Sequence, residues 1–153
     1  MIEEGPDSFM QHWRAYAAQA TLFPRPEGTP MLEAEVAGCI LQLFERTNPY
    51  HAPPGPARLV LHVTAERWDP AEVGEASLRV PVLGTLHGRG RVKHREGRTV
   101  VVDAGAPLVL TFAGTDAPAP EGRWIHFEAP APLHAFVLPP VRKSAATPVD
   151  DAL

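Results

Sequence analysis

The sequence predicts an α+β protein, with two N-terminal helices followed by a mainly antiparallel, coiled β-sheet or barrel of about five to six strands. Helical spacing of apolar residues in the N-terminal third predicts the helices. Period-two alternation between Leu78 and Val92 predicts a long strand with one buried and one exposed face. No helical pattern falls between the later strands, and strands without crossover helices pair mainly in an antiparallel manner.

Composition is consistent with a single compact domain. The 153 residues are enough to bury a core without disulfides, and 44% of them are hydrophobic. The 18 prolines indicate short elements joined by stiff loops. Because the net charge is −4, the chain as a whole does not attract nucleic acid, and anion binding requires a local basic patch.

The sequence lacks the pattern of a secretory signal and the roughly 18 consecutive apolar residues of a membrane span. Cys39 is the only cysteine, which excludes an internal disulfide. We therefore expect a cytoplasmic protein with no membrane partner. Basic residues are mostly arginine, and together with abundant alanine and proline this indicates a GC-rich bacterial genome.

The first helix is expected to begin at Asp7 or Ser8, which are good N-caps, and to continue to about Thr21. Helical spacing gives it one apolar stripe, formed by Phe9, Trp13, Tyr16, Ala20 and Phe23. The stripe predicts that this helix packs on a sheet or on a partner subunit.

A second helix is predicted from Thr29 to about Arg46. Thr29 is a suitable N-cap, Pro30 fits the first helical position, and Glu33 and Glu35 lie near the positive end of the helix dipole. Its buried face would consist of Leu32, Val36, Cys39, Ile40, Leu43 and Phe44.

A proline-rich connector, residues 47–56, separates a helical portion from a β-rich portion. The helical portion is residues 1–50 and the β-rich portion is residues 57–138, and we expect the two to form one compact domain. Residues 139–153 are expected to be a disordered tail.

The β-rich portion is expected to contain strands at 58–68, 78–93, 99–103, 108–112, 124–128 and 133–138. Gly84, Gly88 and Gly90 would let the long strand bend while it keeps its facing. Glu96 and Gly97 then form the turn to the returning strand.

The long strand ends in a basic run, which is the candidate nucleic-acid-binding surface. Side chains on one face of a strand are about 6.6–6.8 Å apart, comparable to the phosphate spacing of a single strand. Trp68 or Trp124 would supply a base-stacking platform. A charged face also protects a sheet edge from aggregation, which explains the same residues without a ligand. The candidate cations are His87, Arg89, Arg91, Lys93 and Arg95, with Arg98 across the turn.

No catalytic or metal-binding motif is visible, and we expect no catalytic residue, metal or cofactor. There is no G-x-S-x-G motif and no phosphate loop. His62, His126 and His134 lie in predicted strands and would converge with Glu128 or Asp103 only if the fold brings them together.

Residues 78–138 resemble an oligonucleotide/oligosaccharide-binding (OB) barrel. The similar features are the long bent strand up to Lys93, its hairpin to 99–103, and the later strands that contain Trp124 and Phe136. The resemblance implies a five-stranded barrel that binds single-stranded DNA or RNA across its first hairpin.

The sequence also resembles hotdog-fold thioesterases, in which a long helix precedes the strands and a hairpin like residues 89–103 follows. This resemblance implies an obligate dimer that hydrolyses acyl-CoA, with Glu33 and Glu35 as the nearest candidates for a catalytic acid. Neither resemblance rests on a specific motif.

We expect a small non-enzymatic protein that binds single-stranded DNA or RNA through the basic strand, with the helices covering the barrel or forming a homodimer interface. Two alternatives remain open. One is the hotdog-type thioesterase, and the other is a structural or protein-interaction module that makes contact through the stripe around Trp13.

Overall fold

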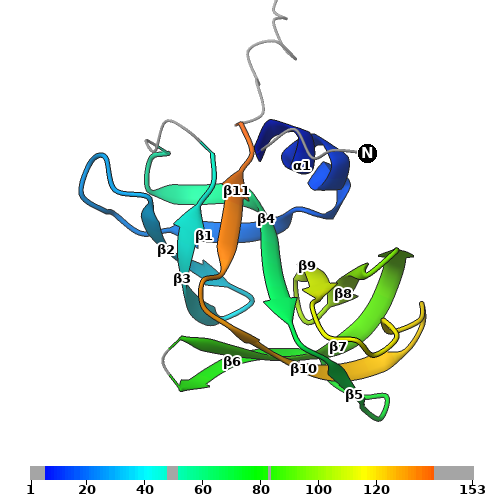
Figure 1. Ribbon diagram of the computed structural model, residues 1–153. Coiled ribbons are helices and arrows are strands. Elements are labelled where there is room, and N and C mark those ends of the chain that lie inside the picture. The colour runs from blue at the N-terminus through cyan, green and yellow to red at the C-terminus, as the bar shows by residue number, and fades with distance from the viewer. Residues whose placement is uncertain (1–5, 48–51, 83, 140–153) are drawn as a thin grey trace, which may run out of the picture.

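The computed structural model describes residues 6–47, 52–82 and 84–139, and most of these residues lie in β-strands (Figure 1). The chain begins with a helix, α1 (Pro6–Trp13), and one turn of 3-10 helix, η1 (Arg14–Tyr16). The strands that follow are β1 (Ala18–Leu22), β2 (Met31–Val36), β3 (Cys39–Glu45), β4 (Gly55–Ala65), β5 (Trp68–Pro70), β6 (Ser77–Val82), β7 (Thr85–Glu96), β8 (Thr99–Asp103), β9 (Pro107–Phe112), β10 (Trp124–Pro130) and β11 (His134–Val137). No described helix is long and apolar enough to span a membrane.

Five strands form a closed barrel. Their order is β1-β2-β3-β11-β4, and β4 pairs back with β1. Alternate side chains fill the interior, because every second residue of a strand points to the same face; those of the first two strands are Ala18, Ala20, Leu22, Leu32, Ala34 and Val36. A five-stranded barrel was predicted, but residues 18–65 with 134–137 form it rather than residues 78–138.

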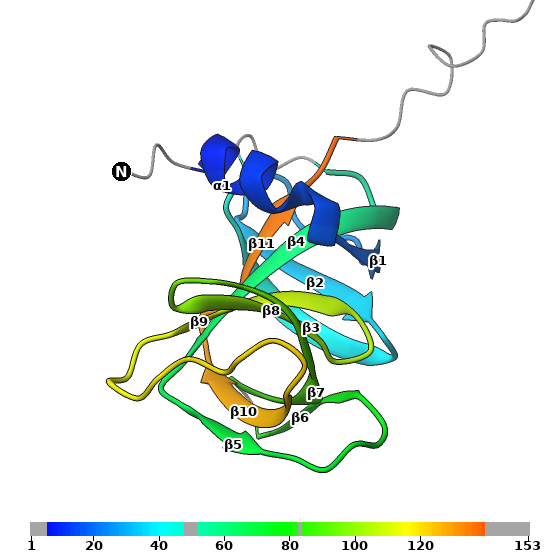
Figure 2. The same ribbon diagram turned by 90° about the vertical axis from the view of Figure 1, so that its right-hand side faces the viewer.

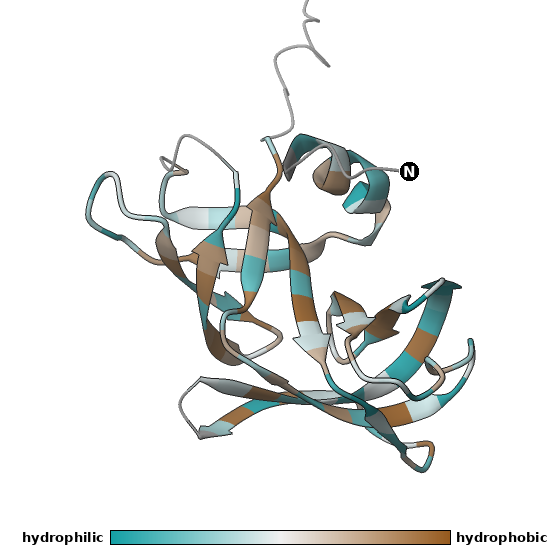
Figure 3. Ribbon diagram, viewed as in Figure 1, coloured by the Kyte–Doolittle hydropathy of each residue, from teal (hydrophilic) through white to brown (hydrophobic). Residues whose placement is uncertain are grey.

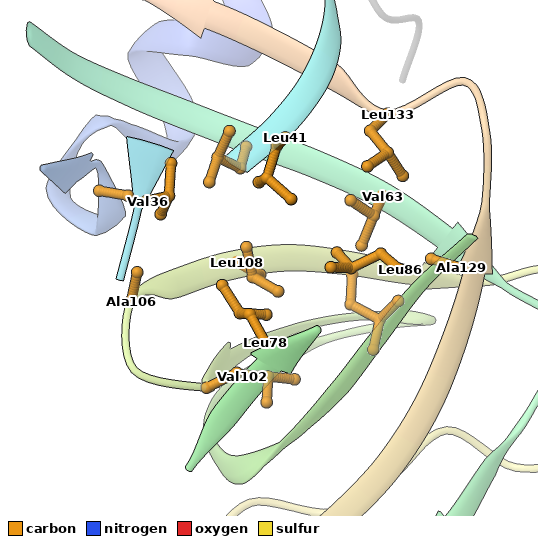
Figure 4. Close-up of a cluster of buried hydrophobic side chains, with 14 of the residues drawn as sticks. Val36, Leu41, Val63, Leu78, Leu86, Val102, Ala106, Leu108, Ala129 and Leu133 are labelled. Atoms are coloured by element: carbon orange, nitrogen blue, oxygen red, sulfur yellow. The ribbon is translucent and has the colours of Figure 1, made fainter. Parts of the chain in front are cut away.

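A second sheet continues from the barrel through β4. Its order is β4-β9-β8-β7-β10-β5, and β6 pairs with the first half of β7. The prediction of mainly antiparallel pairing is confirmed, because only β3–β11 and β4–β9 are parallel among the described strands. Figure 4 shows side chains from the barrel and from the second sheet meeting in one apolar core.

The N-terminal helix is shorter than predicted. It ends at Trp13, and residues 18–22, predicted to continue it, form β1. The local preference for a helix there is overridden by pairing of β1 with both β2 and β4. Phe9, Trp13 and Tyr16 of the predicted stripe do pack on a sheet, because α1 and η1 cover an apolar cluster on β4, β8, β9 and β11 (Figure 2). Ala20 belongs instead to the core inside the barrel.

The predicted second helix is wrong, since residues 31–45 form the β2–β3 hairpin. Buried and exposed residues alternate along both strands, as a half-buried strand requires. Ala37 and Gly38 both have positive φ, 52° and 79°, the conformation of a tight two-residue hairpin turn. In the described part of the predicted helical portion, residues 6–47, the structure therefore has one short helix, one 3-10 turn and three strands.

The predicted long strand is two strands, β6 and β7, joined by a turn at Gly84. Gly84 has φ +87°, a backbone conformation that residues other than glycine rarely adopt. Glycine at this position therefore permits the chain to reverse direction. Gly88 and Gly90 do permit close approach: a Cβ at Gly88 would overlap the Phe127 ring, and one at Gly90 would overlap the Asp103 carbonyl.

The remaining predicted strands are present with small shifts. The strand predicted at 58–68 is β4, which ends at Ala65, and Trp68 begins the separate β5. The segment 99–103 is β8 as predicted, and the last three predicted strands correspond to β9, β10 and β11. Nearly all of the predicted tail, residues 140–153, lies outside the described residues.

Candidate functional site

β6, β7, β10 and β5 lie side by side and direct one face away from the main core (Figure 1). Their core-facing side chains include Leu78, Leu86 and Phe127, which alternate with polar residues on the open face. Hydrophobic and hydrophilic segments accordingly alternate along β7 and β10 in Figure 3. The open face carries Asp69, Ser77, Arg79, Thr85, His87, Arg89, Arg91, Trp124, His126 and Glu128.

This face is hollowed into an open groove of about 740 Å³. The strand register arranges the side chains of the groove in rows. Ser77 lies opposite Arg89, which lies opposite His126, and His126 lies opposite Asp69. The groove is lined by Glu66, Arg67, Asp69, Ser77, Arg79, Thr85, His87, Gly88, Arg89, His126, Phe127, Glu128 and Pro130.

Charge is segregated across the groove. The β6–β7 side carries only cationic and neutral residues, because the first acidic residue of these strands is Glu96 at the far end of β7. The β5–β10 side carries the acids that line the groove, Glu66, Asp69 and Glu128, together with Arg67 and His126. An extended anion is therefore favoured along the β6–β7 side. We call its arginines the cationic wall: Arg79 and Arg89 in the groove, and Arg91 just beyond it.

Arg89 lies at the centre of the cationic wall. Its guanidinium lies over the Trp124 ring, with Cζ 5.2 Å from the ring centroid. It donates hydrogen bonds to the backbone carbonyls of Glu72 and Glu75, at 2.5 Å for the second. Gly74 of the loop between β5 and β6 also lies against the guanidinium, since a Cβ there would be 3.0–3.4 Å from Nη2, Nη1 and Cζ. Arg89 therefore covers Trp124 and is itself held by this loop.

Arg91 and Lys93 continue the positive charge beyond the groove. Both are exposed, and both line a smaller hollow of about 320 Å³ with Val92, Glu121 and Gly122. Neither side chain makes an ion pair within the described residues. The pairing of β7 with β8 shifts register between Val92 and His94, so Lys93 is the extra residue of a β-bulge.

The same bulge divides the predicted basic face. Beyond it, Arg95 is paired with Val100, whose side chain is in the main core, whereas Arg91 is paired with the exposed Asp103. Paired residues point to the same side of a sheet, so Arg95 projects from the face opposite to Arg91. The prediction that His87 to Arg95 share one face is therefore wrong after Lys93.

Arg98 and Trp68 are placed away from the open face. Arg98 donates to the carbonyls of Phe112, Gly114 and Asp116, at 2.8, 2.5 and 2.8 Å, and so holds the loop after β9. Trp68 packs against the main core, and its Nε1 donates to the Ala117 carbonyl at 2.9 Å. The contacts of both residues are therefore structural, and neither side chain belongs to the open face.

Two of the three histidines considered from the sequence do converge, although not with an acid. The His62 and His134 rings are 6.3 Å apart; His62 Nε2 is 3.0 Å from the Thr111 hydroxyl, and His134 Nδ1 is 3.1 Å from Arg46 Nη1. Phe9 of α1 lies over His62 at 4.6 Å between ring centroids.

The surroundings of His62 disfavour its protonation. Burial lowers the pKa of His62 to about 4, with further contributions from His134 and Arg46. Burial and the charge of Arg46 also lower the pKa of His134. His126 lies on the open face, in a different part of the molecule, and no group of three or more His, Cys, Asp or Glu side chains in the described ranges is arranged to hold a metal.

No protein-family model matches this chain, and no curated protein matches it. The site therefore rests on its own geometry. Sequence reasoning had missed Arg79, Asp69 and Glu66. The alternation that places Arg89 outward also places Arg79 outward on β6, whereas β5 is too short for its pattern to identify Asp69 as a neighbour of the basic strand.

Proposed function

We propose that this chain is a non-enzymatic protein that binds single-stranded nucleic acid across the open face of β6, β7 and β10. The observation that carries the proposal is the cationic wall, which lies beside an open polar groove and continues to Lys93. DNA and RNA are equally compatible with it.

Phosphates would lie along β7. Arg89 and Arg91 are on one face of this strand two residues apart, a spacing of about 6.6–6.8 Å that is close to the phosphate repeat of a single strand. Arg79 extends the positive charge to the neighbouring strand and makes no ion pair within the described residues. Arg79 and Arg91 can therefore meet phosphates without first breaking a salt bridge, whereas Arg89 already donates to two backbone carbonyls.

Arg89 supplies a positive charge that is fixed in position beside the groove. The Trp124 ring packs against its guanidinium, and the backbone carbonyls of Glu72 and Glu75 fix its orientation. A preorganised cation of this kind favours contact with a phosphate, because little conformational entropy is lost on binding.

The thioesterase alternative has no support in this architecture. The long helix on which the resemblance depended is the β2–β3 hairpin, and Glu33 and Glu35 are exposed on the outside of β2. A protein-interaction module remains a second candidate, but the α1 stripe proposed for its contact packs on the sheet.

Replacing Arg91 and Lys93 together with alanine is expected to weaken binding of a single-stranded oligonucleotide and to flatten its salt dependence. Each phosphate contact contributes about 0.7 to the slope of log K against log salt, so losing two contacts should reduce the slope by about 1.4. Fluorescence anisotropy titrations between 50 and 200 mM salt measure this slope.

A matched control removes two arginines elsewhere. Arg14 is in η1 and Arg58 is in β4, both away from the groove, and replacing these two with alanine changes the net charge by the same amount. The control variant should keep the wild-type slope. An equal loss of slope in both variants would show that net charge alone governs binding, and would contradict the proposal.

A further inference from the structure

We infer that the acidic side of the groove reads the bases, so that the protein prefers strands rich in cytosine over strands of thymine or uracil. This inference rests on the proposed function and extends it from strand binding to base selection. We call Glu66, Asp69 and Glu128 the acidic wall, since they lie on the side of the groove opposite to the β6–β7 cations.

The carboxylates of the acidic wall are free to accept hydrogen bonds. Asp69 and Glu66 are exposed, and their carboxylates make no hydrogen bond or ion pair within the described residues. Glu128 has 71% of its side chain exposed, and its Oε2 is 4.0 Å from Nδ1 of His87. Acids placed beside a phosphate-binding wall weaken binding of any strand by repulsion, unless they make favourable contacts with another part of the ligand.

The register of the sheet separates the two walls by a short, fixed distance. Asp69 is two strands away from Arg89, with His126 between them, which corresponds to about 9–10 Å across the sheet. Glu128 is on the strand next to His87. A single-stranded nucleic acid whose phosphates lie along β7 therefore directs its bases either into solvent or across β10 toward the carboxylates.

The hydrogen-bonding groups on each base edge then decide which bases bind favourably to these carboxylates. An ionised carboxylate only accepts hydrogen bonds. Cytosine presents its N4 amino group as a donor, and Glu or Asp is the side chain that accepts from it; thymine presents the O4 acceptor at the same position, as uracil does. A cytosine beside Asp69 or Glu128 gains a charge-assisted hydrogen bond, whereas a thymine brings two acceptors together.

The test compares 12-nucleotide oligo(dC) and oligo(dT) by fluorescence anisotropy at pH 7.5 and 50 mM salt. Both are pyrimidine strands of equal charge, so the phosphate contribution is the same for each. We expect oligo(dC) to bind about tenfold more tightly, which is the order of discrimination that one good side-chain–base pair gives. The Asp69→Asn, Glu128→Gln double variant should reduce this ratio to about one, because an amide offers a donor as readily as an acceptor.

The Glu33→Gln, Glu35→Gln variant, which removes two carboxylates from the outside of β2, should keep the wild-type ratio. Equal affinity of the wild-type protein for the two oligonucleotides would overturn the inference and leave the proposed function standing. An equal gain in affinity for both in the Asp69, Glu128 variant would show that the acids only repel phosphates, and would overturn it as well. Failure of every oligonucleotide to bind would overturn the proposed function itself.

Discussion

Replacing Arg25 with methionine is expected to lower the free energy of unfolding by about 3–5 kcal/mol, the cost of leaving one partner of a buried ion pair uncompensated. Arg25 pairs with Glu45 at one end of the barrel, and the two side chains are only 9% and 2% exposed. Glu45 is the one buried charged residue in the described part of the chain. Without the guanidinium, its carboxylate keeps a single protein hydrogen bond from a side chain, that of Thr47.

Urea unfolding followed by circular dichroism measures this loss. The double variant Arg25→Met, Glu45→Leu serves as the control, because replacing both partners with apolar residues of similar volume is often neutral or stabilising. We therefore expect the double variant to be more stable than the single one. A single variant within about 1 kcal/mol of the wild-type protein would show that Glu45 is neutralised or hydrated, and would contradict this view of the barrel end.

Acidification is expected to destabilise the fold through His62, by about 2–3 kcal/mol between pH 6.5 and about pH 4. The pKa of His62 is lowered to about 4 in the folded protein, whereas an unfolded histidine titrates near 6.5. Between these values the unfolded state binds a proton that the folded state does not. Protons therefore favour unfolding, and the stability present above pH 6.5 is lost as the pH falls.

The His62→Gln variant isolates this contribution. Glutamine keeps a polar group near the Thr111 hydroxyl and does not titrate, so its free energy of unfolding should depend less steeply on pH over this window. Urea titrations at pH 7.5 and pH 4.5 compare the two proteins. The acidic shift in pKa of His134 leaves some dependence in the variant. Identical slopes for the two proteins would exclude His62 as the origin.

Alternation along the chain predicted the exposed face of β7 correctly as far as Arg91, because that face depends only on the period of a strand. The prediction failed at Lys93, because a bulge is set by pairing with β8 and leaves no mark in the alternation itself. Residues 93–95 are all basic or histidine, so the sequence gives no sign that the side chains after Lys93 change to the opposite face of the sheet. Arg95 and Arg98 were therefore assigned to a surface that they do not share.

The hairpin at residues 31–45 illustrates a different limit. Leu32, Val36 and Leu43 satisfy helical spacing, but alternate positions of the same segment satisfy a strand equally. Glutamate, alanine and leucine favour a helix by intrinsic propensity, and only pairing with β1 and β11 reverses that preference. Gly38 was the one local signal for the turn.

The barrel and the groove depend on contacts between distant parts of the chain. β11 joins the barrel between β3 and β4, and β4 continues into the second sheet through its parallel pairing with β9. Neither pairing is encoded in the local pattern of those strands. For the same reason the acidic wall could not be placed beside the basic strand, since Asp69 reaches it only through β10.

The most direct test of the proposed function is an anisotropy titration of a labelled single-stranded oligonucleotide with the wild-type protein at 50 and 200 mM salt. Three or four phosphate contacts along the cationic wall and Lys93 predict micromolar or tighter binding at 50 mM, weakened about 20- to 50-fold at 200 mM. Absence of binding at 50 mM, or an affinity that salt does not change, would contradict the assignment of this face to nucleic acid.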